Sequence, residues 1–203
     1  MARKPREIVD GAVYHVVSRI NRREMVFQDE AFKDLFLSVL ERAKQKYSFK
    51  IYNFCIMDNH IHLEIQPLDG DELSAIMRWI LQVFAQIYNK VMNCEGHVWY
   101  DRFKSKVIRT MKQFENTFKY IANNPVRAKM VEHPLHYAYN AITWFQKNKM
   151  LGFLEPPDKE RRILIEHFLK MFDPEKGQKT NKKYGFHKQR PGRPKKENNT
   201  IER

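Results

Sequence analysis

The chain has very few cysteines: only Cys55 and Cys94 occur in 203 residues. This count excludes a disulfide framework and a zinc site built from cysteines, and it is typical of a protein in the reducing cytoplasm. Long apolar runs are also missing, so we expect no segment that crosses a membrane. The first residues, Met-Ala-Arg-Lys-Pro-Arg, contain no apolar stretch, so we expect no secretory signal peptide there.

Acidic residues are scarce relative to basic ones. The sequence has 24 Asp and Glu against 37 Lys and Arg, which gives a net charge of +13. Such an excess favours a polyanionic partner, nucleic acid in the first place and an anionic membrane in the second, although a merely basic soluble protein has the same composition. The 42% of hydrophobic residues are enough for a buried core, and the length suits one domain with a tail or two small domains.

Much of the positive charge lies in the last segment, residues 177–203. It holds nine Lys and Arg against two acidic residues, so it supplies seven of the thirteen net charges. With almost no core-forming residues, it is expected to be a disordered DNA-binding tail. Within it, the stretch Arg-Pro-Gly-Arg-Pro-Lys-Lys resembles an AT-hook, which predicts binding to A·T-rich duplex DNA; the alternative is generic salt-dependent affinity. The contact residues would be Arg190, Arg193, Lys195 and Lys196.

A pair of histidines stands out in the first half of the chain. Residues 49–57 and 60–66 are both strand-like, and Asp-Asn between them favours a hairpin turn. Because side chains alternate along a strand, His60 and His62 lie on one face. Two imidazoles on one face form half of a metal site, and Glu64 continues that face as a possible ligand. The alternative is two histidines on a solvated sheet face.

The surrounding pattern predicts a mixed α and β domain. Residues 12–19 form another strand-like run, and its His15 could approach the histidine pair if the two strands are neighbours. A packed or solvated histidine is the alternative there. Apolar residues at three- and four-residue spacing predict amphipathic helices, and a short run predicts a fourth strand. The helices are expected at residues 30–47, 72–93 and 158–172, and the strand at residues 105–109.

A second chemical element lies in the helix that a capping box, Thr110-x-x-Gln113, predicts. Its apolar residues are Phe114, Phe118, Ile121 and Ala122. Tyr120 and Asn124, four residues apart, are expected on its polar face, and the helix should end before Pro125. Tyr120 can be an ordinary surface residue. Beside a metal site, however, its phenol could attack phosphorus without ATP, and Asn124 could complete a Mg²⁺ or Mn²⁺ site.

Two basic loops could contact nucleic acid. The first is residues 20–24, and the second, residues 96–104, mixes aromatic with basic residues. Exposed aromatic rings stack on bases while arginines and lysines bind phosphates, but solvated charges and aromatics packed on their own domain are equally consistent with the pattern. The basic candidates in these loops are Arg22, Arg23, Arg102 and Lys104, and the aromatic candidates are Trp99, Tyr100 and Phe103. Arg19 and Arg127, outside the two loops, are further candidates for contact with DNA.

Four motifs occur in order along the chain. They are Tyr-His-Val-Val-Ser-Arg (14–19), Met-Asp-Asn-His-Ile-His-Leu (57–63), Gly-His-Val-Trp-Tyr-Asp-Arg-Phe-Lys-Ser (96–105) and Tyr-Ile-Ala-Asn-Asn-Pro-Val-Arg-Ala (120–128). Together they resemble the single-tyrosine HUH transposases, in particular their REP-associated branch. The resemblance covers about residues 8–145. Asp58 replaces a frequent proline in the turn, and Glu64 stands where an apolar residue is common, so Glu64 would either join the metal site or disturb it.

The resemblance implies an α+β fold, an RRM- or ferredoxin-like antiparallel sheet with helices packed on one face. It implies a metal held by His60, His62 and Asn124, with no nucleotide cofactor, and Tyr120 as nucleophile. The implied reaction cleaves single-stranded DNA near REP-like hairpins through a 5′-phosphotyrosine and is reversed on rejoining. The protein would be a bacterial, cytoplasmic, nucleoid-associated monomer or homodimer. We expect a nuclease domain at residues 1–149, a helical extension at 150–176, and the tail.

Two other functions remain open from the sequence. A nucleic-acid-binding module derived from a transposase would bind hairpins without cleaving them. A metal-dependent phosphodiesterase that uses water would cleave without a covalent adduct; the absence of further clustered His and Asp residues argues mildly against it.

Overall fold

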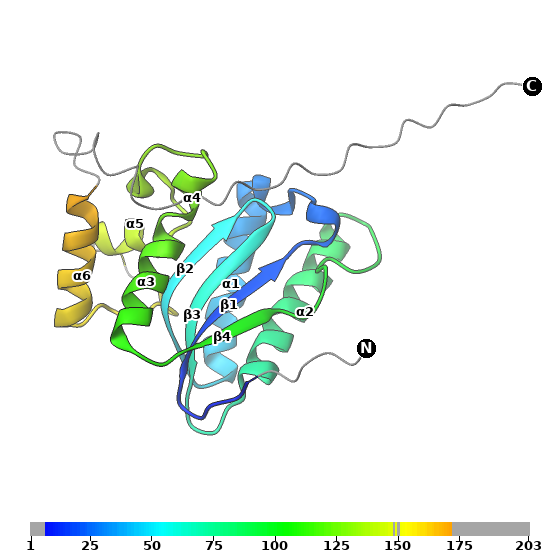
Figure 1. The fold of residues 1–203 in the computed structure, drawn as a ribbon. Coiled ribbons are helices and arrows are strands. Elements are labelled where there is room, and N and C mark those ends of the chain that lie inside the picture. Colours follow the sequence, from blue (N-terminus) through cyan, green and yellow to red (C-terminus); the bar gives the residue numbers. More distant parts are fainter. Residues whose placement is uncertain (1–6, 148, 150, 172–203) are drawn as a thin grey trace, which may run out of the picture.

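The computed structural model describes residues 7–147, 149 and 151–171. Four antiparallel strands form one sheet in the order β2-β3-β1-β4, and the chain runs β-α-β-β-α-β through it (Figure 1). This is the ferredoxin-like arrangement, so the expected α+β fold is confirmed. The strands are β1 (Val13–Arg19), β2 (Phe49–Met57), β3 (His60–Pro67) and β4 (Lys104–Ile108).

The helices cover both faces of this sheet unequally. Two long helices, α1 (Glu30–Lys46) and α2 (Leu73–Val91), pack together on one face, as expected. The shorter α3 (Met111–Ala122) lies across β2 and β3 on the other face (Figure 1). The fold therefore adds one helix to the face that the histidines occupy.

Alternation along β3 separates an apolar face from a polar one. Ile61, Leu63 and Ile65 are fully buried in the core. His60 and His62 point the other way, because neighbouring strand residues face opposite sides. Four aromatic rings anchor the layer of α1 and α2 at ring-centre distances of 5.1 to 6.2 Å, which are ordinary for packed aromatic pairs. They are Phe27, Phe36, Phe84 and Trp99.

The turn between β2 and β3 is fixed by contacts to α1 and to the end of β1. Asp58 forms an ion pair of 3.2 Å with Lys33, a lysine of α1 whose side chain is buried. The amide of Ile20 donates to the carbonyl of Asn59 at 2.9 Å. Asp58 thus connects the turn that carries the histidine pair to the helical layer.

The capping box forms at the start of α3. The Gln113 amide donates to Thr110 Oγ1 at 3.1 Å, and Gln113 Oε1 accepts from the amide of Arg109 at 2.7 Å. The end of the helix differs from expectation. It ends at Ala122, and Pro125 lies in the first turn of a separate short helix, α4 (Asn124–Arg127). Proline is well suited to a first turn, where its missing N–H has no helical partner.

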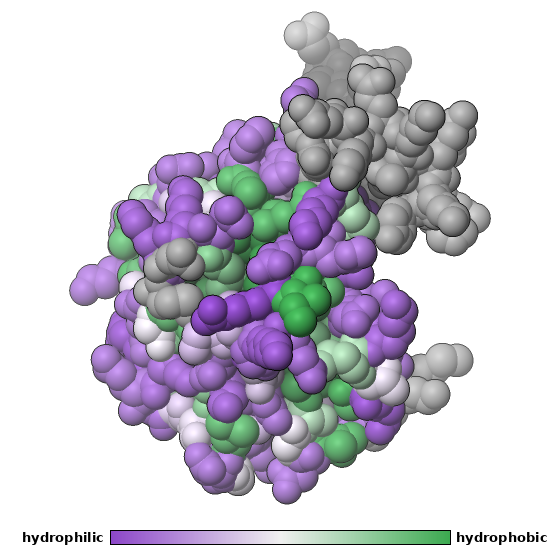
Figure 2. Space-filling view, turned by 90° about the vertical axis from the view of Figure 1, so that its left-hand side faces the viewer, coloured by the Kyte–Doolittle hydropathy of each residue, from purple (hydrophilic) through white to green (hydrophobic). Residues whose placement is uncertain are grey.

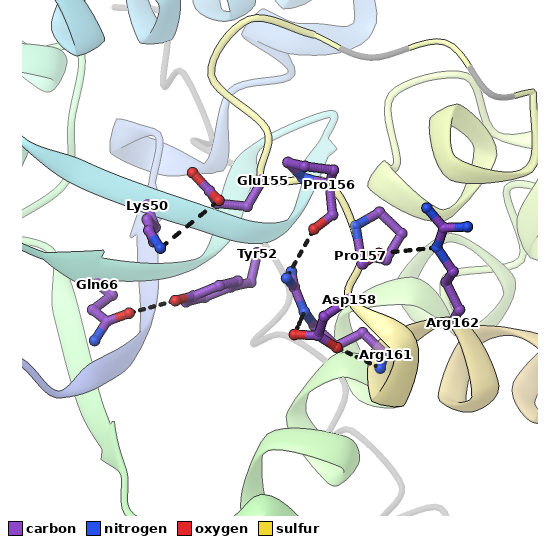
Figure 3. Close-up of polar contacts among 9 residues, drawn as sticks. All are labelled: Lys50, Tyr52, Gln66, Glu155, Pro156, Pro157, Asp158, Arg161 and Arg162. Atoms are coloured by element: carbon purple, nitrogen blue, oxygen red, sulfur yellow. Dashed lines mark hydrogen bonds and ion pairs between the residues drawn. The ribbon is translucent and has the colours of Figure 1, made fainter.

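The segment after α4 extends the edge of β2 and ends in two helices, α5 (Ala141–Gln146) and α6 (Lys159–Lys170). The amide of Glu155 donates to the carbonyl of Ile51 at 2.8 Å. Arg161 of α6 binds Asp158 and the carbonyl of Pro156, and its guanidinium lies 4.7 Å from the ring centre of Tyr52 (Figure 3). The beginning of α6 is therefore attached to β2.

The side of the molecule on which α6 lies is mostly hydrophilic, with apolar groups scattered between polar ones (Figure 2). Among the described residues, no helix combines the length and the apolar character that a membrane span requires. The predicted division into residues 1–149, 150–176 and 177–203 stays a prediction, and the tail lies outside the described residues.

Candidate active site

In each of the two histidines of β3, the ring nitrogen Nδ1 has a hydrogen-bond partner. Nδ1 of His60 lies 2.7 Å from Oδ1 of Asn59, and Nδ1 of His62 lies 3.0 Å from Nε2 of His15. Nε2 of His62 is buried and has no hydrogen-bond partner within the described part of the chain. A buried ring nitrogen without a partner fits a ligand position, because an imidazole held through one nitrogen presents the other to a metal.

Burial keeps these imidazoles neutral. Burial, together with nearby Arg19, lowers the pKa of His60 to about 4. The pKa of His62 lies well below its ordinary value for the same main reason, with the neighbouring His60 and His15 adding to the effect. Burial, then Lys106, lowers the pKa of His15 to about 4. Neutral imidazole is the form that coordinates a metal, so near pH 7 both rings are in the protonation state that a metal ligand requires.

Tyr120 of α3 lies directly over this group. Its ring centre is 5.7 Å from that of His62 and 5.8 Å from that of His15. The Arg127 guanidinium lies 4.8 Å from the centre of the Tyr120 ring, which is a cation–π contact. Tyr120 is 40% exposed, so a nucleic acid can reach it. The fold thus brings together the histidine pair of β3, the phenol of α3 and the arginine of α4.

Two further sequence candidates occupy different positions around the pair. Asn124 is buried, and its Nδ2 donates to the carbonyl of Tyr120 at 3.0 Å, which holds its amide group beside the end of α3. Glu64 is fully buried opposite His15. Burial raises its pKa well above the usual range, against the lowering effects of a side-chain hydrogen bond with Asn53 and of Arg161. Within the described part of the chain, no three His, Cys, Asp or Glu side chains are grouped to hold a metal.

A basic pocket of about 400 Å³ opens where β1 ends and β4 begins. Its wall is fixed by backbone bonds, since the Tyr100 amide donates to the carbonyl of Arg19 at 2.9 Å. In the pairing of β1 with β3, Arg19 lies directly opposite His60, so the pocket adjoins the histidine pair. The basic pocket is lined by Val17, Arg19, Ile20, Arg22, Arg23, Tyr100, Asp101, Arg102 and Lys104.

Of the three loop aromatics that are candidates for stacking on bases, two are packed in the protein and one is exposed. Trp99 packs in the aromatic core, and its Nε1 donates to the carbonyl of Leu81 at 2.8 Å; Phe103 is buried as well. Tyr100 is 70% exposed at the basic pocket. The predicted tail residues Arg190, Arg193, Lys195 and Lys196 lie outside the described residues.

One residue of the site was only weakly indicated by the sequence. His15 had been expected to approach the pair only if its strand were a neighbour, and β1 does pair with β3 in the structure. The signal was its position in strand alternation, on the same face as Val13 and Val17.

Comparison with known proteins identifies the family to which the chain belongs. Residues 8–124, more than half of the chain, match the family model described as "Transposase IS200 like". A protein of Haemophilus influenzae named as a REP-associated tyrosine transposase is 24% identical over 152 residues, which cover 70% of this chain and 86% of that protein. The structure of a REP-associated tyrosine transposase bound to a REP hairpin superimposes with a TM-score of 0.61 at 17% identity, covering 77% of this chain and 93% of the other, and so has the same fold. The chain therefore belongs to the family of IS200-like transposases, enzymes that act on DNA.

Proposed function

We propose that this protein is a metal-dependent, site-specific single-stranded DNA endonuclease and strand transferase that uses Tyr120 as its nucleophile. The observation that carries the proposal is the position of the Tyr120 ring, 5.7 Å from the ring of His62 and beside Arg127. A phenol, a pair of neutral imidazoles and a guanidinium in one place suit the transfer of a phosphodiester to a protein oxygen.

The metal would be held by Nε2 of His60 and of His62, with the amide oxygen of Asn124 as third ligand. Mg²⁺ or Mn²⁺ suits a site of two imidazoles and one amide oxygen with positions left for phosphate. When bound, such an ion would polarise the scissile phosphate and offset the charge that develops on it. Glu64 remains a possible further ligand, and no nucleotide cofactor is required.

In the reaction itself, the Tyr120 oxygen attacks phosphorus and loses its proton. The new bond joins this oxygen to phosphorus, while the bond from phosphorus to the 3′ oxygen breaks and that oxygen takes up a proton. The products are a 5′-phosphotyrosine and a free 3′-OH. Because one phosphodiester replaces another, the step is reversible without ATP. Arg127, whose guanidinium lies over the Tyr120 ring, would hold a phosphate beside the phenol.

The proposed substrate is a REP-like hairpin with an adjoining single strand. The structurally similar REP-associated tyrosine transposase is bound to a REP hairpin, and the basic pocket of this chain adjoins the histidine pair, where it would receive the single strand. Acting there would place the protein on the bacterial nucleoid. A contact of the tail with A·T-rich duplex and a monomeric or homodimeric state belong to the same proposal.

A denaturing gel tests the proposal directly. The protein is incubated with end-labelled single-stranded hairpin DNA from the flanks of its own gene, with Mn²⁺ or Mg²⁺, and in parallel with a chelator. We expect a protein–DNA band that survives denaturation and requires the metal. Binding without such a band, across several flanking hairpins, would instead favour a non-enzymatic binding module, and cleavage without the band would favour hydrolysis by water.

Arg22 and Arg23 should contribute to DNA affinity through phosphate contacts. Both have positive φ, 50° and 59°, and both line the basic pocket. For single strands, each lost phosphate contact lowers the slope of log K against log salt by about 0.7. We therefore expect a double Arg22→Ala, Arg23→Ala variant to show a slope smaller by about 1.4, measured by fluorescence anisotropy at several salt concentrations.

The matched control is Arg42→Ala with Arg78→Ala, which removes the same charge from exposed positions on α1 and α2, on the opposite face of the sheet. Equal slopes for the two double variants would show that the basic pocket is not the site of phosphate contact.

A further inference from the structure

His15 has no role in the reaction proposed above, yet it contacts the centre of the site. Its Nε2 lies 3.0 Å from Nδ1 of His62, and the two rings are stacked at 5.2 Å with an angle of 18° between their planes. The contact depends on strand pairing, because β1 places Val17 opposite His62 and His15 opposite Glu64. His15 therefore lies two residue pairs along the strands from His62, on the same face of the sheet.

The hydrogen bond between the two rings has only two possible directions. In the first, His62 Nδ1 carries the proton and donates it to His15 Nε2, which leaves a lone pair on His62 Nε2. In the second, His15 donates, and the proton of neutral His62 sits on Nε2. In that case a buried N–H would have no acceptor, since Nε2 of His62 has no partner among the described residues. Buried donors without an acceptor are rare because desolvating them is costly.

The neighbouring histidine shows the same orientation. Nδ1 of His60 lies 2.7 Å from Oδ1 of Asn59, and an amide oxygen can only accept, so His60 Nδ1 is the donor. His60 thus also keeps its lone pair on Nε2. In the first arrangement both rings of β3 are held at Nδ1, one by Asn59 and one by His15, and both present Nε2.

We infer that His15 is a positioning residue that accepts the Nδ1 proton of His62 and so fixes Nε2 of His62 as its metal-binding nitrogen. The inference rests on the proposed function in one respect, namely that His60 and His62 hold the metal. Partners at the second nitrogen of a ligating histidine set its tautomer and its ring orientation. Here the partner is another imidazole, supplied by a strand that carries none of the proposed metal ligands.

The direct test is long-range ¹H–¹⁵N NMR of the histidine side chains in the metal-free wild-type protein near neutral pH. We expect His62 to be protonated on Nδ1 and unprotonated on Nε2. A His62 ring protonated on Nε2 would overturn the inference. The measurement needs no variant and no active enzyme, so its result does not depend on whether DNA is cleaved.

Two substitutions separate the hydrogen bond from simple packing. His15→Gln keeps an oxygen that can accept from His62 Nδ1, whereas His15→Phe keeps a ring without an acceptor. We expect Mn²⁺ affinity, measured by electron paramagnetic resonance, to fall about 10- to 100-fold in His15→Phe and to be largely restored in His15→Gln. The matched control is His97→Phe at an exposed loop position, which should bind Mn²⁺ like the wild type.

The outcomes also separate this inference from the proposed function. If the wild type binds Mn²⁺ and His15→Phe binds it equally well, the role of His15 is refuted while the metal site stands. If Mn²⁺ binding is unaffected when His60 and His62 are both replaced, the proposed metal site is wrong, and so is the assignment of Nε2 of His62 as a metal-binding nitrogen. The NMR result would then test only whether His15 accepts the Nδ1 proton of His62. Thermal unfolding of each variant, followed by circular dichroism, shows whether a loss of binding comes from unfolding.

Discussion

A Tyr120→Phe variant should bind hairpin DNA almost as well as the wild type while forming no covalent adduct. The substitution removes one oxygen, and the ring contacts of Tyr120 with His62, His15 and Arg127 can all persist. Without a nucleophile, the rate of strand cleavage should fall by at least about 10⁴-fold, the scale seen when a nucleophile is removed from an otherwise intact site. The adduct is measured on a denaturing gel, and binding by a mobility shift under native conditions.

The control is Tyr47→Phe, which removes the same hydroxyl group from the residue that follows α1. It should form the adduct at the wild-type rate. An adduct in Tyr120→Phe that survives denaturation would assign the nucleophile to another residue and would refute the central part of the proposal.

Replacement of either histidine of β3 should have the second-largest effect. In His60→Ala or His62→Ala, one imidazole ligand is lost, and the charge stabilisation from the metal, worth several kcal/mol, is lost with it. Since each 1.4 kcal/mol is a factor of ten in rate, we expect cleavage to slow on the order of 10³-fold. DNA binding in the presence of chelator should stay close to that of the wild type, because the basic pocket is unchanged.

The measurement is the rate of adduct formation as a function of Mn²⁺ concentration. His136→Ala is the matched control, since His136 lies in a short 3₁₀ helix, Pro134–His136, that supplies no residue of the proposed site. If the His60 and His62 variants keep the Mn²⁺ dependence of the wild type, the metal is bound elsewhere. A comparison of thermal unfolding is needed for His62, because its side chain is buried and its removal leaves a cavity.

The position of the histidine pair on one face could be predicted from the sequence because it depends only on local geometry. Strand alternation is a property of the backbone, so His60 and His62 share a face in any sheet that contains this strand. The same holds for the capping box at Thr110 and Gln113, whose bonds join residues close in sequence. The family resemblance supplied the fold, which adjacent elements alone do not specify.

The end of α3 shows the limit of such local rules. The residue before a proline is biased against helix, which predicted that one helix would carry both Tyr120 and Asn124 and stop at Pro125. In the structure the helix breaks earlier, and Pro125 begins α4. Asn124 precedes a proline and yet begins α4. Proline fits the first turn of a helix, and Asn124 is held by the hydrogen bond that its Nδ2 donates to the Tyr120 carbonyl.

The sequence by itself determined which candidate groups are available: a histidine pair on one strand face, a tyrosine on a helix, arginines in two loops, and Arg127. Only the tertiary structure decided which of them meet. The pairing of β1 with β3 brings His15 to His62, and the docking of α3 on the histidine face brings Tyr120 to both. Strand register and helix docking are set by burial of whole faces, between residues far apart in sequence. For the same reason Trp99 packs in the core while the adjacent Tyr100 stays exposed at the basic pocket.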